Sequence, residues 1–593
     1  MKRYYSAILL ICASIFTFNC QKEINYLNYG FSGANNNPAP FKATLQGNII
    51  DENDLPAENV TIQVGDKTTT TNTDGYFRIV NASLDKNAAL VIAEKAGYFK
   101  ALRSFNATSG ANNVTIKLIK KRHAGTIDAI AGGNVTLSNG SIIALPANAM
   151  IKANSNSAYT GTVNIYTSYI DPTADDIGQL VPGSFMADDK NNKRVTLASY
   201  GMLAIELEST AGEKLQIGPG YTATLTVSIP SSLQSSAPAT IALWHVDERS
   251  GIWKEEGTAV KSGTNYVGQV NHFSFWNCDI GIPAVTLSVT LKTGKAVPVV
   301  HGEVRLTLTS SGLPSQAYGY TDSMGQVSGL VPAGEPIVLE VLDPCHNVAY
   351  SQNIGSLNQN TDLGTITINN SSSPALIIIE GQLRDCSNQP VTDGYAIISC
   401  DNVTRYVSVN EKGEFAISFL RCSGGSASCE ILGVDESGQQ QGGPSTTTIA
   451  TPITNSGVID ACGVSAAQFI NYTLDGVDHS ITSNAGDSLT SYSYASPATP
   501  PLFTWMSGFK ISANEYISLS FGHEAAAGSY SLNAISVQGF DSVAIVQPSN
   551  VVLTNYPSNA GGFYEGTFSG KFKGPANLVP VHTIIGSFRI RRL

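Results

Sequence analysis

At 593 residues, the chain has room for about four domains of roughly 150 residues each. Hydrophobic residues make up 42% of it and charged residues 14%, a balance that supports folded cores and excludes a disordered acidic chain, a coiled coil and a collagen. The formal net charge of −11 provides no basic surface, so nucleic acid is not an expected partner.

The N-terminus has the pattern of a bacterial export signal. Lys2 and Arg3 precede the apolar run 7–18, which is too short to cross a bilayer as a helix. The run is followed at once by Asn19 and Cys20, and a cysteine in this place resembles the lipobox of bacterial lipoproteins, in the looser form found in Bacteroidetes. The resemblance implies a signal peptide over 1–19 and lipidation of Cys20. The alternative is an ordinary cleaved signal with an incidental cysteine.

Residues 20–40 are expected to form a flexible tether, because they end in a stretch of Asn, Pro and Ala. Within the tether, Gln21-Lys22-Glu23 resembles the short charged tag that sends such lipoproteins to the cell surface. We therefore expect a chain held by a lipid anchor in the outer membrane and exposed at the cell surface. The membrane is then one partner, and the sequence leaves the leaflet open.

Beyond the tether, short runs alternate between apolar and polar residues, as in 224–229 and 516–521, and turn clusters break them about every ten residues. This pattern is typical of antiparallel β-sandwiches and barrels. We predict an all-β fold of tandem Ig-like or transthyretin-like β-sandwich modules that ends in an antiparallel β-sandwich or barrel. The predicted modules are 41–120, 121–283, 284–372, 373–464 and 465–593.

A strand–turn–strand–hairpin repeat occurs three times. In each copy the turn ends in Pro, and the hairpin tip needs a Gly with positive φ. The paired segments are 47–64 with 73–79, 295–298 with 321–327, and 381–391 with 410–417. The first copy closely resembles the transthyretin-like regulatory domain found beside zinc carboxypeptidases and at the front of TonB-dependent receptors. The other two are weaker matches, and general Ig-like relatives are the alternative for them.

Two further modules have distinctive patterns. The segments 140–147, 242–248, 251–256 and 272–276 resemble a β-rich module shared by cartilage intermediate layer protein and bacterial surface proteins. That resemblance implies a structural extracellular module without a known catalytic site. The stretches around Trp244 and Trp253 should form a hairpin that turns at 247–251. The last module, 465–593, resembles a C-terminal domain of unknown function in Bacteroidetes lipoproteins, and its glycine-bent strands predict a closed or curled antiparallel sheet.

Six cysteines cluster between residues 345 and 462. An exported chain permits disulfides, and the clustering predicts local bridges, although six cysteines allow 15 pairings and none is assigned. The alternative is a set of buried free thiols that act as small hydrophobic side chains. The disulfide candidates are Cys345, Cys386, Cys400, Cys422, Cys429 and Cys462.

No catalytic site, metal site or cofactor is expected. His245 and Glu248 have the His-x-x-Glu spacing of zinc carboxypeptidases, with His346 about a hundred residues further on. They lie in the Trp-rich hairpin, however, and the chain has no room for the α/β catalytic domain of those enzymes. The acidic pair Asp188-Asp189 lacks the alternating spacing of a calcium loop, so we expect a solvated loop there.

Of the four tryptophans, Trp244, Trp253 and Trp276 are expected in the core. Trp505 follows Pro500-Pro501 and is the candidate for an exposed ring that stacks on a ligand. The sequence therefore favours a non-enzymatic cell-envelope lipoprotein that binds or scaffolds, with a glycan or a surface protein as the candidate ligand. Two alternatives stay open, an accessory subunit or hydrolase acting on glycan or peptide, and a structural adhesin. The oligomeric state is also open.

Overall fold

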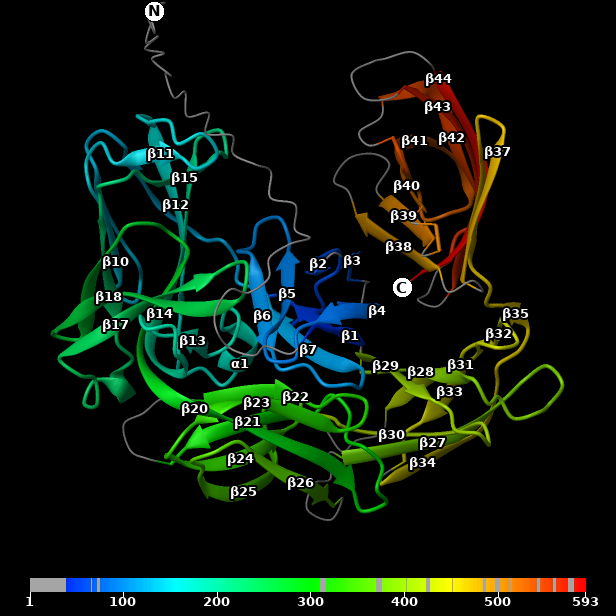
Figure 1. Ribbon diagram of the computed structural model, residues 1–593, viewed down its shortest axis with the longest axis horizontal. Coiled ribbons are helices and arrows are strands. Elements are labelled where there is room, and N and C mark those ends of the chain that lie inside the picture. Colours follow the sequence, from blue (N-terminus) through cyan, green and yellow to red (C-terminus); the bar gives the residue numbers. More distant parts are fainter. Residues whose placement is uncertain are drawn as a thin grey trace, which may run out of the picture. The chain divides into compact units, whose positions relative to one another are not determined.

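The computed structural model describes residues 39–592 apart from short gaps at 66, 72–74, 310–315, 370–375, 402, 423–426, 451, 484–486, 496–501, 511, 514, 541–543, 558–561 and 574–580. Strands dominate these residues, and the helical segments among them are α1 (Ile177–Leu180) and the 3-10 turn Ser231–Leu233. None of the helices described is long and apolar enough to cross a membrane. The predicted all-β fold class is confirmed (Figure 1).

The first repeat copy consists of a three-stranded and a four-stranded sheet that enclose one core. Its strand β1 pairs antiparallel with β4 and parallel with β7. Alternation places one side of each strand inward, as in β5, where Ala89, Val91 and Ala93 are buried. The two sheets contain β1 (Phe41–Ile50), β4 (Tyr76–Leu84) and β7 (Asn112–Lys117), and β2 (Thr61–Val64), β3 (Lys67–Thr70), β5 (Ala89–Glu94) and β6 (Ala101–Phe105).

The second and third copies repeat this pairing, since the second half of β20 and the whole of β27 each have one antiparallel and one parallel neighbour. The second copy contains β20 (Phe275–Thr293), β23 (Gln326–Pro332) and β26 (Thr361–Ile368), with β21 (Glu303–Leu308), β22 (Gln316–Tyr320), β24 (Pro336–Leu342) and β25 (Val348–Ser356). The third contains β27 (Leu376–Arg384), β30 (Glu414–Leu420) and β34 (Ile453–Asp460), with β28 (Gly394–Cys400), β29 (Val403–Ser408), β31 (Ser428–Asp435), β32 (Gln440–Gln441), β33 (Ser445–Thr448) and β35 (Val464–Ser465).

The hairpin predicted at the glycine of each copy is wrong, because the strands before and after the turn pair in different sheets. The turn that joins the two sheets nevertheless has its glycine in the predicted conformation, since Gly75, Gly325 and Gly413 have φ of 67°, 76° and 75°. A Cβ at these positions would lie 2.3, 2.3 and 2.7 Å from a carbonyl oxygen of the first strand of its copy. The residue bearing that oxygen also donates its N–H to the glycine carbonyl, at 2.8, 2.7 and 2.8 Å. The strand therefore approaches so closely that a side chain has no room.

The module between the first and second copies has two cores, which lie on opposite faces of β17. Leu243 belongs to one core and Trp244 to the other, because successive residues of a strand point to opposite faces. Its strands are β8 (His123–Asp128), β9 (Gly133–Thr136), β10 (Ile142–Leu145), β11 (Met150–Lys152), β12 (Thr162–Ile170), β13 (Met186–Asp188), β14 (Arg194–Ser209), β15 (Lys214–Ile217), β16 (Ala223–Ser228), β17 (Thr240–Asp247), β18 (Ile252–Ser262) and β19 (Asn265–Val270).

The predicted tryptophan hairpin is confirmed. Strands β17 and β18 pair antiparallel, with Asp247 opposite Ile252. The three tryptophans expected in the core are buried, with 2% of Trp244, 0% of Trp253 and 1% of Trp276 exposed.

Strand β20 is shared by two sheets. Its first half pairs with β14 and β17, and its second half pairs with β23 and β26. Pro283 lies opposite Val195 of β14, and the next residue, Ala284, lies opposite Pro332 of β23. The position of the predicted module boundary, 283/284, thus falls within one continuous strand of 19 residues.

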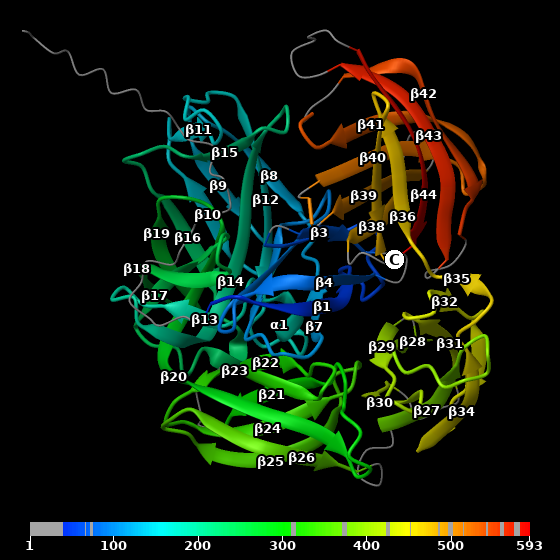
Figure 2. The ribbon, with the colours of Figure 1, turned by 45° about the vertical axis from the view of Figure 1, so that its right-hand side comes forward.

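The C-terminal sheet is antiparallel throughout, in the order β37-β36-β44-β43-β42-β41-β40-β39-β38 (Figure 2). Its two edge strands, β37 and β38, contact each other, so the sheet curls around its own core, as predicted. The strands are β36 (Phe469–Leu474), β37 (Val477–Thr482), β38 (Ser488–Ala495), β39 (Leu502–Lys510), β40 (Glu515–His523), β41 (Gly528–Val537), β42 (Ala544–Asn555), β43 (Phe563–Lys573) and β44 (Val581–Arg591).

Candidate functional site

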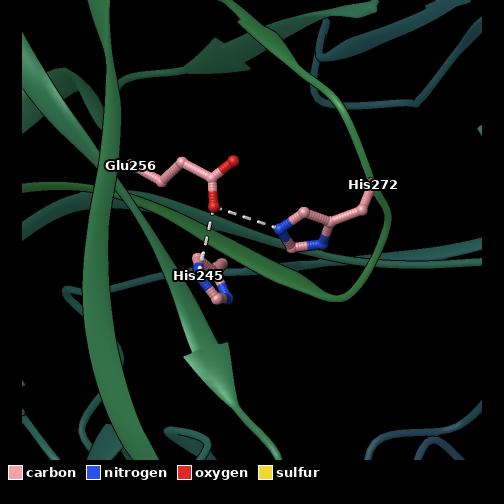
Figure 3. Close-up of side chains that lie close together, drawn as sticks. All are labelled: His245, Glu256 and His272. Carbon is pink, nitrogen blue, oxygen red and sulfur yellow. Dashed lines mark hydrogen bonds and ion pairs between the residues drawn. The ribbon is translucent and has the colours of Figure 1, made fainter. Parts of the chain in front are cut away.

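Two histidines and a glutamate meet at the surface of the module that contains the tryptophan hairpin (Figure 3). His245 comes from β17, Glu256 from β18, and His272 from the loop between β19 and β20. One ligand atom from each lies within 4.8 Å of the other two, and among the described residues this is the one such group of three His, Cys or acidic side chains. We call it the histidine cluster.

Strand pairing explains why His245 and Glu256 share a face. His245 lies opposite Lys254 across the hairpin, so Glu256, two residues further along β18, projects from the same face as a diagonal neighbour. On the other side of β17, His245 lies opposite Trp276 of β20, and their ring centroids are 5.6 Å apart. The buried indole therefore forms the floor of the cluster.

The loop that carries His272 is held at both of its sides. The indole N–H of Trp276 donates to the carbonyl oxygen of His272 at 3.0 Å. The next residue, Phe273, exchanges two hydrogen bonds with the side chain of Gln216 on β15, at 2.8 and 2.9 Å. These bonds place the His272 ring beside His245, with centroids 4.7 Å apart.

The Glu256 carboxylate is shared by both imidazoles. Its Oε2 lies 3.2 Å from Nε2 of His245 and 3.4 Å from Nε2 of His272. Burial, followed by the neighbouring imidazole of His272, lowers the pKa of His245, and the Glu256 carboxylate offsets these effects only in part. His245 is therefore neutral at pH 7, the form in which an imidazole binds a metal ion.

The spacing considered in the sequence does not form this site. Strand β17 ends at Asp247, so His245 lies on the strand and Glu248 in the turn that follows, and the two side chains do not converge. Glu248 instead forms an ion pair with Lys100, with Nζ 3.0 Å from the carboxylate. His346 lies in the turn between β24 and β25, 3.9 Å from Glu303. Sequence reasoning thus missed two residues of the cluster. A diagonal-pair test on the predicted hairpin would have indicated Glu256, whereas His272 lies in a loop outside the hairpin and no local pattern indicates it.

All six clustered cysteines are paired. The disulfides are Cys345–Cys422, Cys386–Cys462 and Cys400–Cys429. The remaining cysteine of the described residues, Cys278, is buried, and burial raises the pKa of its thiol, which keeps it protonated.

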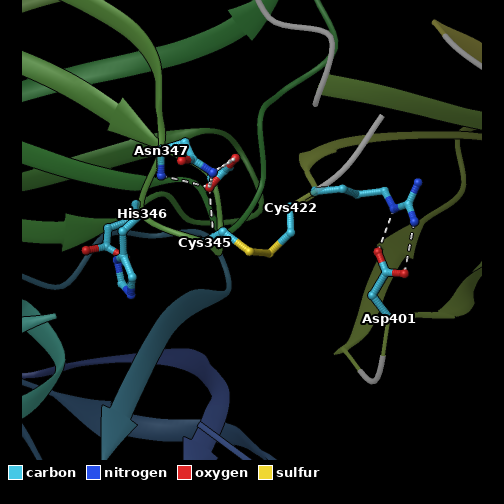
Figure 4. The surroundings of a disulfide bond; sticks show 8 residues. Cys345, His346, Asn347, Asp401 and Cys422 are labelled. Atoms are coloured by element: carbon cyan, nitrogen blue, oxygen red, sulfur yellow. Dashed lines mark hydrogen bonds and ion pairs between the residues drawn. A yellow bond between two sulfur atoms is a disulfide. The ribbon is translucent and has the colours of Figure 1, made fainter. Parts of the chain in front are cut away.

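The Cys345–Cys422 bond joins two repeat copies (Figure 4). Cys345 lies in the turn between β24 and β25 of the second copy, and Cys422 follows β30 of the third. The Asp343 carboxylate holds the turn by accepting the N–H groups of Cys345 and Asn347, at 2.8 and 3.0 Å. Beside Cys422, the guanidinium of Arg421 donates to both carboxylate oxygens of Asp401. Both ends of the disulfide are therefore fixed by local hydrogen bonds.

Trp505, the predicted ligand contact, lies half-buried on β39, where its ring stacks on Tyr492 with centroids 6.4 Å apart.

Asp188, expected in a solvated loop, instead lies in β13 between two cations. Its carboxylate is 2.5 Å from Nζ of Lys254 and 2.6 Å from Nε of Arg194. Cys20, the predicted lipidation site, and most of the tether lie outside the described residues.

A hydroxyl and an imidazole also meet in the C-terminal sheet. The Oγ1 of Thr504 lies 2.5 Å from Nε2 of His523, whose Nδ1 donates to the carbonyl oxygen of Glu524 at 2.6 Å. This order resembles a nucleophile–base pair. Both side chains are fully buried, with 0% exposed, so a substrate has no route to them and the pair is a structural hydrogen-bond network.

A scan of the sequence against protein-family models finds no match, and no curated protein matches it. The family resemblances drawn from the motifs therefore stay predictions. Among solved structures, a streptococcal ancillary pilin is 9% identical, with a TM-score of 0.13, and the match covers 38% of this chain and 94% of the pilin. The shaft pilin SpaA of Lactobacillus rhamnosus GG is 10% identical, with a TM-score of 0.16 and coverage of 30% and 98%. The major pilin subunit of Bacillus cereus is 10% identical, with a TM-score of 0.12 and coverage of 71% and 99%. At TM-scores this low the chains do not superpose as wholes, so the function proposed below does not depend on them.

Proposed function

We propose that this chain is an exported, non-enzymatic structural protein of the cell envelope, anchored by a lipid at Cys20 in the outer membrane. In this role its β-sandwich modules act as a stiff support that presents a surface away from the membrane. The proposal favours the structural adhesin among the alternatives that the sequence left open, and a scaffold over a hydrolase.

The observation that carries the proposal is the pairing of all six clustered cysteines. Structural disulfides persist in oxidising compartments and are rare in the cytoplasm, so three of them in 118 consecutive residues favour export. The Cys345–Cys422 bond adds a covalent link between two repeat copies. Such a link limits their relative motion, which suits a load-bearing role better than a catalytic one.

The shared strand β20 supports the same conclusion. Modules joined by flexible linkers move independently, whereas a strand that belongs to two sheets leaves no free linker between them. The hydrogen-bonded backbone of β20 therefore restricts motion of the second copy relative to the tryptophan-hairpin module.

The side chains also support a role without catalysis. The Thr504–His523 pair is sealed from solvent. In the histidine cluster, Glu256 is engaged by both imidazoles, so the cluster leaves no separate carboxylate to act as a general base.

Thiol trapping in cells tests the proposal. Cells that produce the full chain are quenched with acid, denatured, and labelled with a maleimide that adds a fixed mass to each free thiol. If the chain is exported, oxidised and lipidated, the mature protein should carry one label, on Cys278. A Cys278→Ser variant is the matched control and should carry none.

A chain retained in the cytoplasm would react at all nine of its cysteines and would contradict the proposal. Labelling of the six clustered cysteines in the membrane-bound mature protein would likewise overturn the structural role assigned to the disulfides.

A further inference from the structure

We propose that the histidine cluster is a metal site, in which His245, Glu256 and His272 bind a divalent first-row transition metal of the zinc type. Two imidazole nitrogens and one carboxylate oxygen form a donor set that zinc accepts in proteins. The site joins the hairpin β17–β18 to the loop that leads into β20, and it goes beyond the structural function proposed above.

The spacing of the donor atoms fits a tetrahedral ion. With metal–ligand bonds of about 2.0–2.1 Å, two ligands of a tetrahedral centre lie about 3.3 Å apart. The observed separations from Glu256 Oε2 to the two imidazole nitrogens are 3.2 and 3.4 Å. The three ligand atoms lie within 4.8 Å of one another, so the distance between the two imidazole nitrogens is the one that has to shorten when a metal binds. A small rotation of the partly exposed His272 ring would supply this adjustment.

Local hydrogen bonds hold the loop that carries one of the ligands. The His272 backbone is fixed by the Trp276 indole N–H, and the following residue is fixed by the Gln216 side chain. Because the loop is already ordered, metal binding has a smaller entropic cost. None of the Lys or Arg side chains in the described part of the chain forms an ion pair with Glu256, so a cation held by the cluster would have no competitor there.

The exposure of the ligands gives the site an open side. The exposed fraction of the side chain is 21% for His245, 38% for Glu256 and 34% for His272. Three protein ligands leave the fourth position of a tetrahedral ion to water or to a donor from another molecule. The bound metal would therefore fix the hairpin to the root of β20 and present an exchangeable position at the surface.

Metal titration of the purified mature chain, without a polyhistidine tag, tests the proposal. Cobalt(II) serves as the spectroscopic probe, because a tetrahedral site gives intense visible absorption, and zinc is then added to displace it. We expect one cobalt ion per chain, displaced by one equivalent of zinc. Cobalt should also quench part of the tryptophan fluorescence, since the Trp276 ring centroid lies 5.0 Å from that of His272.

The variants separate this site from adventitious binding. Loss of a group that supports a ligand typically weakens metal binding by about tenfold or more, and loss of the ligand itself should weaken it further. His272→Ala and Glu256→Gln should therefore each lower the metal affinity by at least about tenfold. The matched control is His479→Ala, because His479 also pairs with a glutamate, Glu515, at 2.8 Å, but lacks a second histidine. Its affinity should equal that of the wild type.

His272 lies in a loop, so its variant keeps the sheet intact, and the near-ultraviolet circular dichroism of each variant verifies this. A wild-type chain that gives no visible cobalt band and binds no zinc overturns the proposal. Equal affinity of the wild type, His272→Ala and Glu256→Gln overturns it as well.

Discussion

The disulfide between the second and third repeat copies offers a direct test of how the two are coupled. The perturbation is the double variant Cys345→Ala/Cys422→Ala, which removes the bond without leaving a free thiol. A cross-link stabilises a fold mainly by restricting the unfolded chain, and the effect grows with the length of the closed loop. Loss of the bond should therefore destabilise both copies when they unfold together.

The loop length sets the magnitude. The two cysteines are 77 residues apart in sequence, and the Cys400–Cys429 bond shortens the effective loop to roughly 60 residues, which makes the chain-entropy stabilisation about 4 kcal/mol. This is an upper value, because residual structure in the unfolded chain reduces the entropy that the bond removes. At 1.4 kcal/mol for each factor of ten, it corresponds to about a thousandfold in the population of the open state.

Hydrogen exchange with mass spectrometry is the appropriate assay. Trp276 lies in the half of β20 that pairs with β14 and β17, and the other tryptophans, at 244, 253 and 505, lie outside the two copies that the bond joins. Fluorescence therefore does not report on the cores of these copies. Exchange is measured instead in peptides from β24 and β27. Both strands contribute buried residues to cores, so their amides exchange only when a large part of the copy unfolds. In the double variant, both peptides should exchange up to about a thousandfold faster than in the wild type.

The control variant is Cys400→Ala/Cys429→Ala, whose bond lies within the third copy and spans 29 residues. It should speed exchange in β27 and leave β24 unchanged. The reasoning is refuted if the Cys345→Ala/Cys422→Ala variant exchanges like the wild type in both strands, or if the control variant speeds β24 equally.

Three further outcomes are expected. A left-handed backbone costs a residue with a Cβ about 1–2 kcal/mol, and Gly413→Ala should destabilise the third copy by more than this, because its Cβ would also meet the Leu383 carbonyl oxygen. Gly457→Ala is the control and should lose only the backbone cost, since Gly457 has φ of 72° and nothing within 4 Å of the added Cβ. Hydrogen exchange of β27 compares the two variants, and equal effects would show that the Leu383 carbonyl oxygen does not restrict position 413. Burial raises the pKa of Asp188, but the Lys254 and Arg194 cations outweigh it and hold the pKa below its usual value. Asp188→Asn should therefore lower the free energy of unfolding by about 2 kcal/mol at pH 7. The difference in stability between variant and wild type should vanish as the pH falls from about 4 through the lowered pKa of Asp188 in the folded protein. Urea unfolding followed by tryptophan fluorescence measures it, and a difference that persists at low pH would contradict the ion-pair assignment. Cys20→Ser should release the chain from membranes in cell fractionation, and unchanged membrane association would disprove the anchor.

Local patterns allowed the fold to be predicted from the sequence. The turn glycines were recognisable because a tight turn with positive φ admits few residues, and the structure has Gly75, Gly325 and Gly413 in that conformation. The alternation around Trp244 and Trp253 likewise fixed the hairpin and its turn. In each case the physical cause lies within about ten residues of chain. The hairpins expected around the three glycines were not found, because which sheet a strand joins depends on contacts outside the turn.

The candidate site depends on contacts that no local pattern contains. In the His-x-x-Glu spacing that we considered, Glu248 follows the end of β17 and forms an ion pair with Lys100 instead of joining His245. His272 reaches the cluster because the β20 pairing brings Trp276 opposite His245. The disulfide partners are separated by up to 77 residues, so their pairing follows only from the packing of the sheets.

The unbroken course of β20 also bears on how genes for such proteins can recombine. Modules joined by linkers can be exchanged between genes, because each keeps all of its own strands. Here the residues of β20 up to Pro283 pair with β14 and β17, and those from Ala284 onward lie between β23 and β26 and pair with both. A crossover at that point would deprive one sheet or the other of an internal strand and leave unpaired backbone groups in its core. Residues 121–372 should therefore recombine only as one unit, with the junctions of gene shuffling outside them.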